Sequence, residues 1–165
     1  MDNYIMFEGQ KIPLTDEQVE MIKSCADKKK SPFERVEYNQ RYYYIDAGGT
    51  VSESTDGDFA DDNECFNAAN YCTDEELMEQ RALHETLNRL LWRFSMENGE
   101  GERLWDNDHA HWYIEYSHVA GTYHVRWVYN MHGIGIVHFP SAEIAQRAVV
   151  EIIEPFTKKH PDFVM

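Results

Sequence analysis

The sequence predicts an α+β fold in which antiparallel strands and amphipathic helices share one core. Three patterns predict it: aromatic and β-branched runs broken by glycine, capping residues ahead of apolar helical segments, and short connections between successive strands. The apolar content is 42% over 165 residues, which suffices for a core of ordinary domain size. We therefore expect a single domain over residues 1–165, composed of two strands-then-helix units over about 1–98 and 104–165.

The first segment predicts a hairpin followed by a helix. Residues 4–14 form two short apolar runs on either side of Gly9. Thr15 and Gln18 have the spacing of a capping box, in which a hydroxyl and an amide each accept a backbone N–H. The lysine run 28–30 is typical of a helix C-terminus, where positive charge complements the helix dipole.

A second hairpin and the longest helix come next. Residues 41–46 and 50–54 flank a glycine turn, which predicts an antiparallel pair. Thr73 is the expected N-cap of the long helix, which ends at Asn98-Gly99. One face of this helix is apolar and carries Leu83, Leu87, Leu90, Leu91 and Phe94. Trp92 falls outside that spacing, so both a core position and an interface anchor remain open for it.

The C-terminal third predicts a three-stranded antiparallel meander and a last helix. The strands are expected at 111–116, 122–129 and 135–139, because connections this short cannot make parallel crossovers. Ser141 caps the last helix, and a basic end at 158–160 closes it. The predicted architecture is thus a hairpin and a three-stranded meander packed with one long and two shorter helices.

Charge restricts the classes of partner. The 15 basic and 30 acidic residues leave a net charge of −15, which repels nucleic acid and anionic membranes and favours basic proteins. The three cysteines form no CxxC pair, and no stretch matches a secretion signal or a membrane helix. We expect a cytoplasmic protein that binds neither nucleic acid nor membranes directly and that needs no cofactor. The sequence does not determine its oligomeric state.

Eleven acidic residues lie between Asp46 and Glu79, with no lysine or arginine among them. Acids in the first turn of the long helix stabilise that turn, whereas those in the stretch 55–70, which looks irregular, repel one another. Spaced carboxylates on an exposed loop can occupy a channel that was built for phosphates. A merely solvated acidic loop is the alternative. The candidate partner-binding residues are Asp56, Asp58, Phe59, Asp61, Asp62, Glu64, Glu75, Glu76 and Glu79.

Metal binding offers a second interpretation of two stretches. Asp56 and Asp58 begin like an EF-hand loop, but the glycine and the terminal glutamate of that motif are missing. A His-x-His pair enters the predicted meander and could hold a divalent metal together with nearby carboxylates. The candidates there are Asp106, Asp108, His109 and His111. This cluster would suit a metal-dependent hydrolase or a metal sensor, although it supplies no complete ligand set.

No signature of nucleophilic or nucleotide-dependent catalysis is present. The sequence has no GxSxG elbow, no phosphate-binding GK[ST] loop and no GxGxxG. We therefore expect a binding protein and not an enzyme. A self-associating structural or regulatory protein is a further alternative.

Several stretches resemble a family of small proteins encoded by phages and prophages of Firmicutes. They are 31–36, 42–46, the helical stretch 82–94 and the C-terminal stretch 155–163, and Ala69 stands where the resembling proteins carry glycine. The resemblance implies an accessory protein of a mobile element in a bacterial host cell. Such accessory proteins include anti-CRISPR inhibitors, so it implies a protein that binds and inhibits a nucleic-acid-processing enzyme, with a Cas nuclease such as Cas9 as the first candidate.

Overall fold

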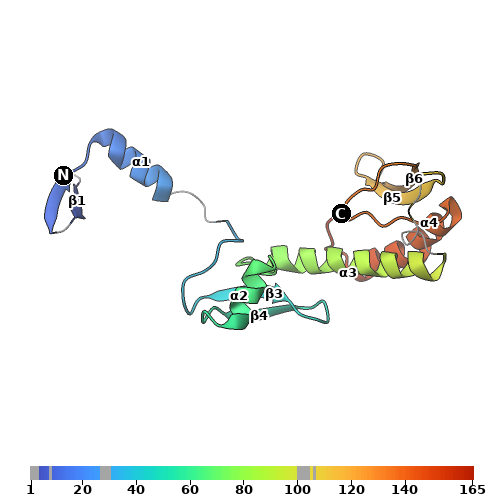
Figure 1. Cartoon of the computed structure of the whole chain (residues 1–165), viewed down its shortest axis with the longest axis horizontal. Helices are drawn as coiled ribbons and strands as arrows, with labels where there is room; N and C mark the ends of the chain where they lie inside the picture. Colours follow the sequence, from blue (N-terminus) through green and yellow to red (C-terminus); the bar gives the residue numbers. More distant parts are fainter. Residues whose placement is uncertain (1–3, 8, 27–30, 100–104, 106) are drawn as a thin grey trace. The chain divides into compact units, whose positions relative to one another are not determined.

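The computed structural model describes residues 4–7, 9–26, 31–99, 105 and 107–165 (Figure 1). The chain divides into two compact units, Met1–Glu34 and Arg35–Met165. No helix within the described ranges has both the length and the apolar character needed to cross a lipid bilayer.

The first unit is a hairpin followed by a helix, as the sequence predicts. Strands β1 (Tyr4–Phe7) and β2 (Gln10–Pro13) pair antiparallel around Gly9, whose φ of 80° suits glycine in a tight turn. Helix α1 spans Asp16–Ala26. The capping box is confirmed, because Gln18 N donates to Thr15 Oγ1 at 3.3 Å and Thr15 N donates to Gln18 Oε1 at 2.9 Å. The lysine run 28–30 lies outside the described residues.

The second hairpin is also confirmed and opens the larger unit. Strands β3 (Arg41–Ile45) and β4 (Val51–Thr55) pair antiparallel, with Ile45 opposite Val51 next to the turn. The carboxylate of Asp46 organises that turn by accepting from the backbone N–H groups of Gly48 and Thr50, each at 2.9 Å. A φ of 84° at Gly49 completes the reversal.

The expectation of an irregular stretch at 55–70 is wrong, because helix α2 spans Ala60–Asn67. The helix has only weak apolar periodicity, and local hydrogen bonds hold its start. The Asp62 carboxylate accepts from Phe59 N at 3.0 Å, and Asn63 Nδ2 donates to the Phe59 carbonyl at 2.8 Å. After the helix, Ala69 has a φ of 54°, a left-handed conformation that favours glycine.

Helix α3 spans Glu75–Glu97 and is the longest element. Its N-cap is Asp74 and not the predicted Thr73, because the Asp74 side chain accepts from Leu77 N at 3.0 Å. The predicted end is confirmed at Asn98, whose side chain donates to the Phe94 carbonyl at 2.9 Å.

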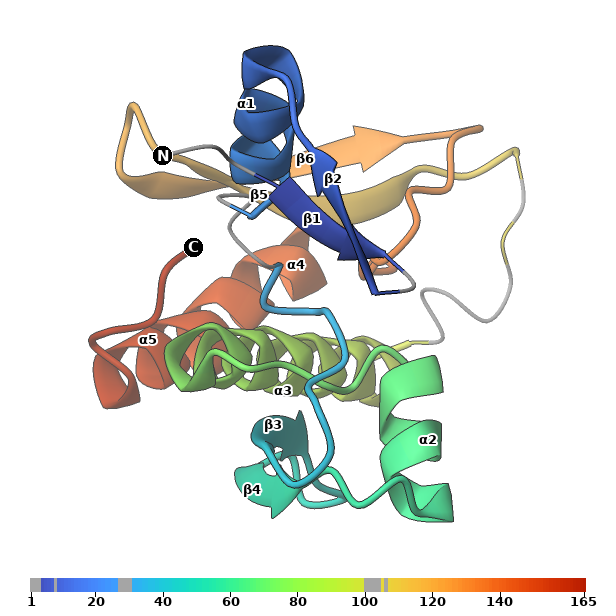
Figure 2. The same cartoon turned by 90° about the vertical axis from the view of Figure 1, so that its left-hand side faces the viewer.

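Two sides of α3 are covered by different parts of the larger unit (Figure 2). Met78 and Ala82 pack with Ile45 and Cys72, which places the β3–β4 hairpin on the N-terminal half of the helix. The C-terminal half packs against the rest of the unit through two further clusters. Their buried residues are Leu87, Phe94, Val137, Phe139, Ala145, Ala148, Val149, Ile153 and Phe156.

The three-stranded meander is not formed. Strands β5 (His111–Ser117) and β6 (Thr122–Val128) form a two-stranded hairpin, and from 135–139 only Phe139 makes a bridge, to Trp112 of β5. Side chains of α3 donate hydrogen bonds to backbone carbonyls of the segment 135–139, and in a third strand such carbonyls would accept from the neighbouring strand. Ser95 Oγ donates to the His138 carbonyl at 2.5 Å, and Asn88 Nδ2 donates to the Gly135 carbonyl at 3.3 Å.

The last helical segment begins at the predicted cap. Ser141 Oγ accepts from Ile144 N at 3.2 Å, and α4 (Ala142–Ala148) follows. A π-helical turn, η1 (Val149–Ile153), leads into α5 (Glu154–Lys159). Pro155 cannot donate to a carbonyl four residues earlier, and this accounts for the local widening of the helix.

Substitution of Phe139 tests the role of this bridge residue in the core. Phe139 is 1% exposed, so we expect Phe139→Ala to lower the free energy of unfolding by about 3–5 kcal/mol. Urea unfolding followed by far-UV circular dichroism measures the change. Val119→Ala, at a fully exposed position, is the control. Equal midpoints for the two variants would contradict the placement of Phe139 in the core.

Candidate functional site

The predicted acidic residues divide between helix α2, the turn before it and the first turns of α3. Asp58, Asp61 and Glu64 are exposed, as are Glu75, Glu76 and Glu79. Asp56 and Asp62 are only 2% and 4% exposed. The eight carboxylates therefore fall into two groups with different environments.

Asp56 is held by a dense set of donors. Arg35 donates to both of its oxygens, at 2.8 Å from Nε and 2.9 Å from Nη2, and the Tyr71 hydroxyl donates at 2.9 Å. The hydrogen bonds from Arg35 hold the pKa of Asp56 well below its usual range, although burial opposes them. Burial raises the pKa of Tyr71 to about 12, so its hydroxyl keeps its proton at neutral pH.

Asp62 occupies a similar position next to the second tyrosine. The Tyr42 hydroxyl donates to it at 2.8 Å, and the backbone N–H groups of Gly57 and Phe59 donate at 2.9 and 3.0 Å. The hydrogen bond from Tyr42 is the main cause of a lowered Asp62 pKa. The rings of Tyr42 and Tyr71 stack with centroids 4.1 Å apart, so the two tyrosine–aspartate pairs form one buried network.

This network corrects the predicted surface. Asp56 and Asp62 bind groups of their own chain and shape the segment between β4 and α2, so they do not belong to the accessible acidic surface. Asp56 is also the first residue of the EF-hand-like stretch, and the hydrogen bonds from Arg35 and Tyr71 occupy its carboxylate. We define the acidic surface of the folded chain as the exposed residues Asp58, Asp61, Glu64, Glu75, Glu76 and Glu79.

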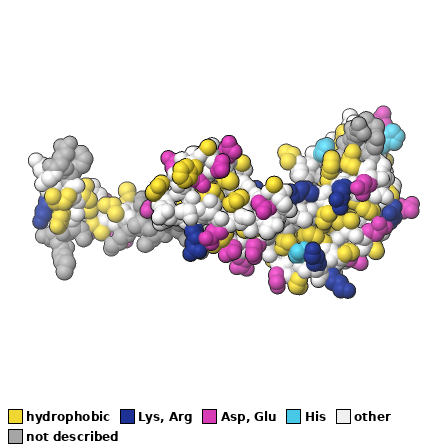
Figure 3. Space-filling model, turned by 90° about the horizontal axis from the view of Figure 1, so that it is seen from below, with side chains coloured by type: hydrophobic (Ala, Val, Ile, Leu, Met, Phe, Trp, Pro, Cys, Tyr) yellow, Lys and Arg dark blue, Asp and Glu magenta, His cyan; other side chains and the backbone are white. Residues whose placement is uncertain are grey.

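Neighbouring arginines do little to neutralise the acidic surface. Arg35 is committed mainly to Asp56 and reaches Asp58 at 3.1 Å. Arg41 pairs with Glu53 at 3.1 Å, and Arg81 pairs with Glu85 at 2.8 Å. Within the described ranges, Asp61, Glu64, Glu75, Glu76 and Glu79 make no ion pair. Figure 3 shows several acidic side chains on the face of the larger unit that is turned to the viewer.

Phe59 is the apolar residue of the same region. It precedes α2 and is 71% exposed, whereas the nearby rings of Phe66 and Tyr71 pack edge to face with centroids 5.4 Å apart. An exposed aromatic side chain beside carboxylates can add apolar contact area to an interface that otherwise consists of ion pairs.

The predicted metal cluster is not assembled in the described part of the chain. Asp106 lies outside it, Asp108 and His109 are exposed, and His111 is 5% exposed at the start of β5. His111 stacks on Trp105 with ring centroids 3.7 Å apart. Across the described residues, no group of three or more His, Cys, Asp or Glu is placed to hold a metal ion.

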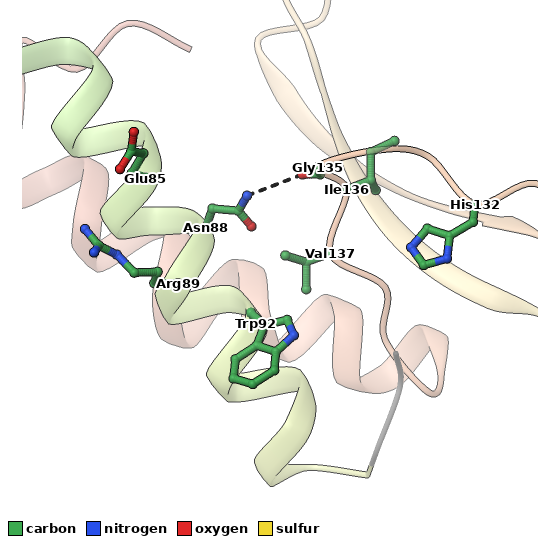
Figure 4. A pocket seen from close by; sticks show the side chains of 8 residues that line it. All are labelled: Glu85, Asn88, Arg89, Trp92, His132, Gly135, Ile136 and Val137. Carbon is green, nitrogen blue, oxygen red and sulfur yellow. Dashed lines mark hydrogen bonds between the residues drawn. The ribbon is translucent and has the colours of Figure 1, made fainter. Parts of the chain in front are cut away.

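A hollow beside α3 was not predicted. It has a volume of ≈ 440 Å³ and faces the segment that replaces the third strand (Figure 4). Its lining consists of Glu85, Asn88, Arg89, Trp92, His132, Gly135, Ile136 and Val137. Trp92, for which the sequence left two roles open, is 51% exposed here. The only feature of the sequence that set Trp92 apart was its position outside the apolar spacing of the long helix.

These features define an acidic α+β protein with a buried carboxylate–tyrosine network, an exposed acidic surface and a hollow beside its longest helix. No family model, curated protein or solved structure matches the chain. The resemblance to phage-encoded proteins therefore stays an expectation from the sequence.

The lowered pKa of Asp56 predicts a pH dependence of stability. Because the folded-state pKa lies below the unfolded value of about 3.9, the stabilisation is present above that value and is lost as pH falls towards the folded pKa. We expect Asp56→Asn to lower the free energy of unfolding by roughly 1–3 kcal/mol at neutral pH. The difference from the unsubstituted protein should shrink below about pH 4.

Urea unfolding at a series of pH values from 7 to 3 measures this dependence. Asp61→Asn, on the exposed side of α2, is the matched control and should change stability by less than about 0.5 kcal/mol. A constant difference between Asp56→Asn and the unsubstituted protein across the series would argue against the network as the cause.

Proposed function

We propose that the protein binds and inhibits a nucleic-acid-processing enzyme of a bacterial host through its acidic surface. The observation that carries the proposal is the set of exposed carboxylates on α2 and the start of α3 that have no basic partner in the described chain. Their charges are available to lysines and arginines of another protein.

The chemistry of the partner follows from this charge. Nucleic-acid enzymes line their channels with lysine and arginine, which bind phosphates largely through ion pairing and counterion release. A protein surface of spaced carboxylates can draw on the same interactions. A Cas nuclease such as Cas9 is the first candidate, in keeping with the expected mobile-element context.

The buried network supports the proposal by fixing the segment that carries these charges. Asp62 bonds to the backbone at Gly57 and Phe59, and Asp56 bonds to the backbone of Asp58 at 3.0 Å. A surface that is already ordered loses less conformational entropy on binding. Phe59 adds an apolar contact next to the charges.

Neutralising the α2 end of the acidic surface tests the proposal. The variant Asp58→Asn/Asp61→Asn/Glu64→Gln removes three exposed charges and keeps the carboxylates of Asp56 and Asp62, although Asp58→Asn also removes the 3.1 Å ion pair with Arg35. Each exposed ion pair contributes up to about 1 kcal/mol, so we expect affinity to fall roughly tenfold to hundredfold. Binding to guide-loaded Cas9 and inhibition of its DNA cleavage, each at increasing salt, are the measurements.

The matched control is Glu143→Gln/Glu154→Gln/Asp162→Asn, which removes the same charge from exposed positions in the C-terminal helical region. Equal inhibition by both triple variants would refute a local acidic interface. If Cas9 is not inhibited, capture from a Firmicutes lysate with elution by salt tests the wider class of enzyme. Failure to retain any nucleic-acid-processing enzyme there would contradict the proposal.

A further inference from the structure

Two hollows lie next to each other on α3 and share Arg89 and Trp92. The first is the hollow of ≈ 440 Å³ in Figure 4. The second, of ≈ 370 Å³, lies towards the β3–β4 turn and is lined by Gly48, Thr86, Leu90 and Arg93 as well as the shared pair. Each volume falls in the range of about 300–1,000 Å³ that is typical of small-molecule sites.

Trp92 presents an aromatic surface between the two hollows. It is 51% exposed, although the same helix buries Leu87 and Phe94. Arg89, Trp92 and Arg93 follow the i, i+3, i+4 spacing, so they lie along one face of α3. A planar ring stacked on the indole would therefore have both guanidinium groups within reach.

The arginines at the hollows differ from the others that the structure describes. Arg35, Arg41, Arg81, Arg126 and Arg147 each have a carboxylate within 3.1 Å. Arg89 instead donates a long hydrogen bond of 3.4 Å from Nη2 to the Thr86 hydroxyl, and the Arg93 guanidinium lies 4.0 Å from the Glu97 carboxylate. No carboxylate lines the second hollow. Within the described residues, Arg89 thus has no carboxylate partner and Arg93 has only a distant one, in a chain of net charge −15.

The β3–β4 turn is shaped around Arg89. A Cβ atom on Gly49 would lie 2.8 Å from Arg89 Nη2, so a larger residue at this position would require the guanidinium to move. The turn and Thr86 therefore both lie close to the Arg89 guanidinium, which donates to Thr86 Oγ1 at 3.4 Å. A partly preorganised guanidinium loses less entropy when it forms hydrogen bonds to an anion.

We propose that the hollows on α3 bind a nucleoside phosphate, with the base stacked on Trp92 and the phosphate held by Arg89 and Arg93. Indole faces stack on any base, and guanidinium groups match phosphate oxygens with two parallel hydrogen bonds. The Glu85 carboxylate at the rim of the first hollow is paired with Arg81, which limits its repulsion of the anion.

The ligand is a mononucleotide and not a nucleic-acid strand. A strand would extend from two arginines over a surface with a large excess of carboxylates, and like charge opposes that contact. A single nucleotide presents one ring and one anionic group, which are the two features that the hollows complement.

Isothermal titration with AMP, adenosine and inorganic phosphate tests the proposal on the full chain at low ionic strength. We expect AMP to bind more tightly than either fragment, because the site has a contact for each part. Arg89→Gln should weaken AMP binding by about tenfold or more. Trp92→Ala should weaken it by fivefold or more, and Trp92→Phe should retain most of the affinity.

The matched control is Arg126→Gln, which makes the same change in net charge on the β5–β6 hairpin and should leave AMP binding unchanged. Absence of AMP binding, or equal weakening by Arg89→Gln and Arg126→Gln, would overturn the proposal. Phosphate binding as tightly as AMP would overturn the stacking role of Trp92. Binding of an acidic peptide with no AMP binding would make this face a protein-docking surface.

The triple substitution Asp58→Asn/Asp61→Asn/Glu64→Gln separates this site from the acidic surface. AMP affinity should be unchanged by it, because none of these residues lines either hollow. Nucleotide binding and enzyme inhibition can therefore fail independently.

Discussion

The packing of α3 on two sides is the constraint on which the larger unit depends. Met78 and Ala82 support the β3–β4 hairpin, while Leu87 and Phe94 support the C-terminal region. Neither two-stranded hairpin is expected to be stable alone, because a pair of strands buries too little apolar surface. Helix α3 supplies the missing surface to the β3–β4 hairpin, and α3 and α4 together supply it to the β5–β6 hairpin. Helix α3 also carries part of the acidic surface and one wall of each hollow, so both candidate sites depend on this packing.

The positions of the charged side chains indicate more about possible binding partners than the net charge does. Two carboxylates of the acidic stretch are buried against tyrosines and backbone N–H groups, and one of them accepts hydrogen bonds from both Nε and Nη2 of Arg35. Other arginines pair with nearby glutamates. Within the described ranges, every residue of the acidic surface except Asp58 therefore makes no ion pair, and Arg89 has no carboxylate partner. One part of the unit is thus suited to a basic partner and another to an anionic ligand. A net charge of −15 predicts only the first.

Local patterns predicted much of the fold correctly. The two N-terminal hairpins, the capping box at Thr15, the end of α3 at Asn98 and the Ser141 cap depend on residues within a few positions of one another. The errors have longer-range or subtler causes. Helix α2 has little apolar periodicity, and the third strand is replaced because Ser95 bonds to the His138 carbonyl across 43 positions. The cap at Asp74 shows that neighbouring oxygen side chains compete for the same role.

The sequence by itself determined the α+β class, the start of α1, the end of α3, the start of α4, the two hairpin turns at Gly9 and Gly49 and the position of the acidic stretch, because each depends on short-range spacing. Only the tertiary structure decided which carboxylates are buried and which are exposed. Asp56 is buried because Arg35 and Tyr71, 21 positions before it and 15 after it, converge on its carboxylate. Trp92 is exposed between two hollows because the β3–β4 turn and residues 132–137 approach α3 on different sides. Burial and pairing are properties of partners brought together by folding, and spacing along the chain does not specify them.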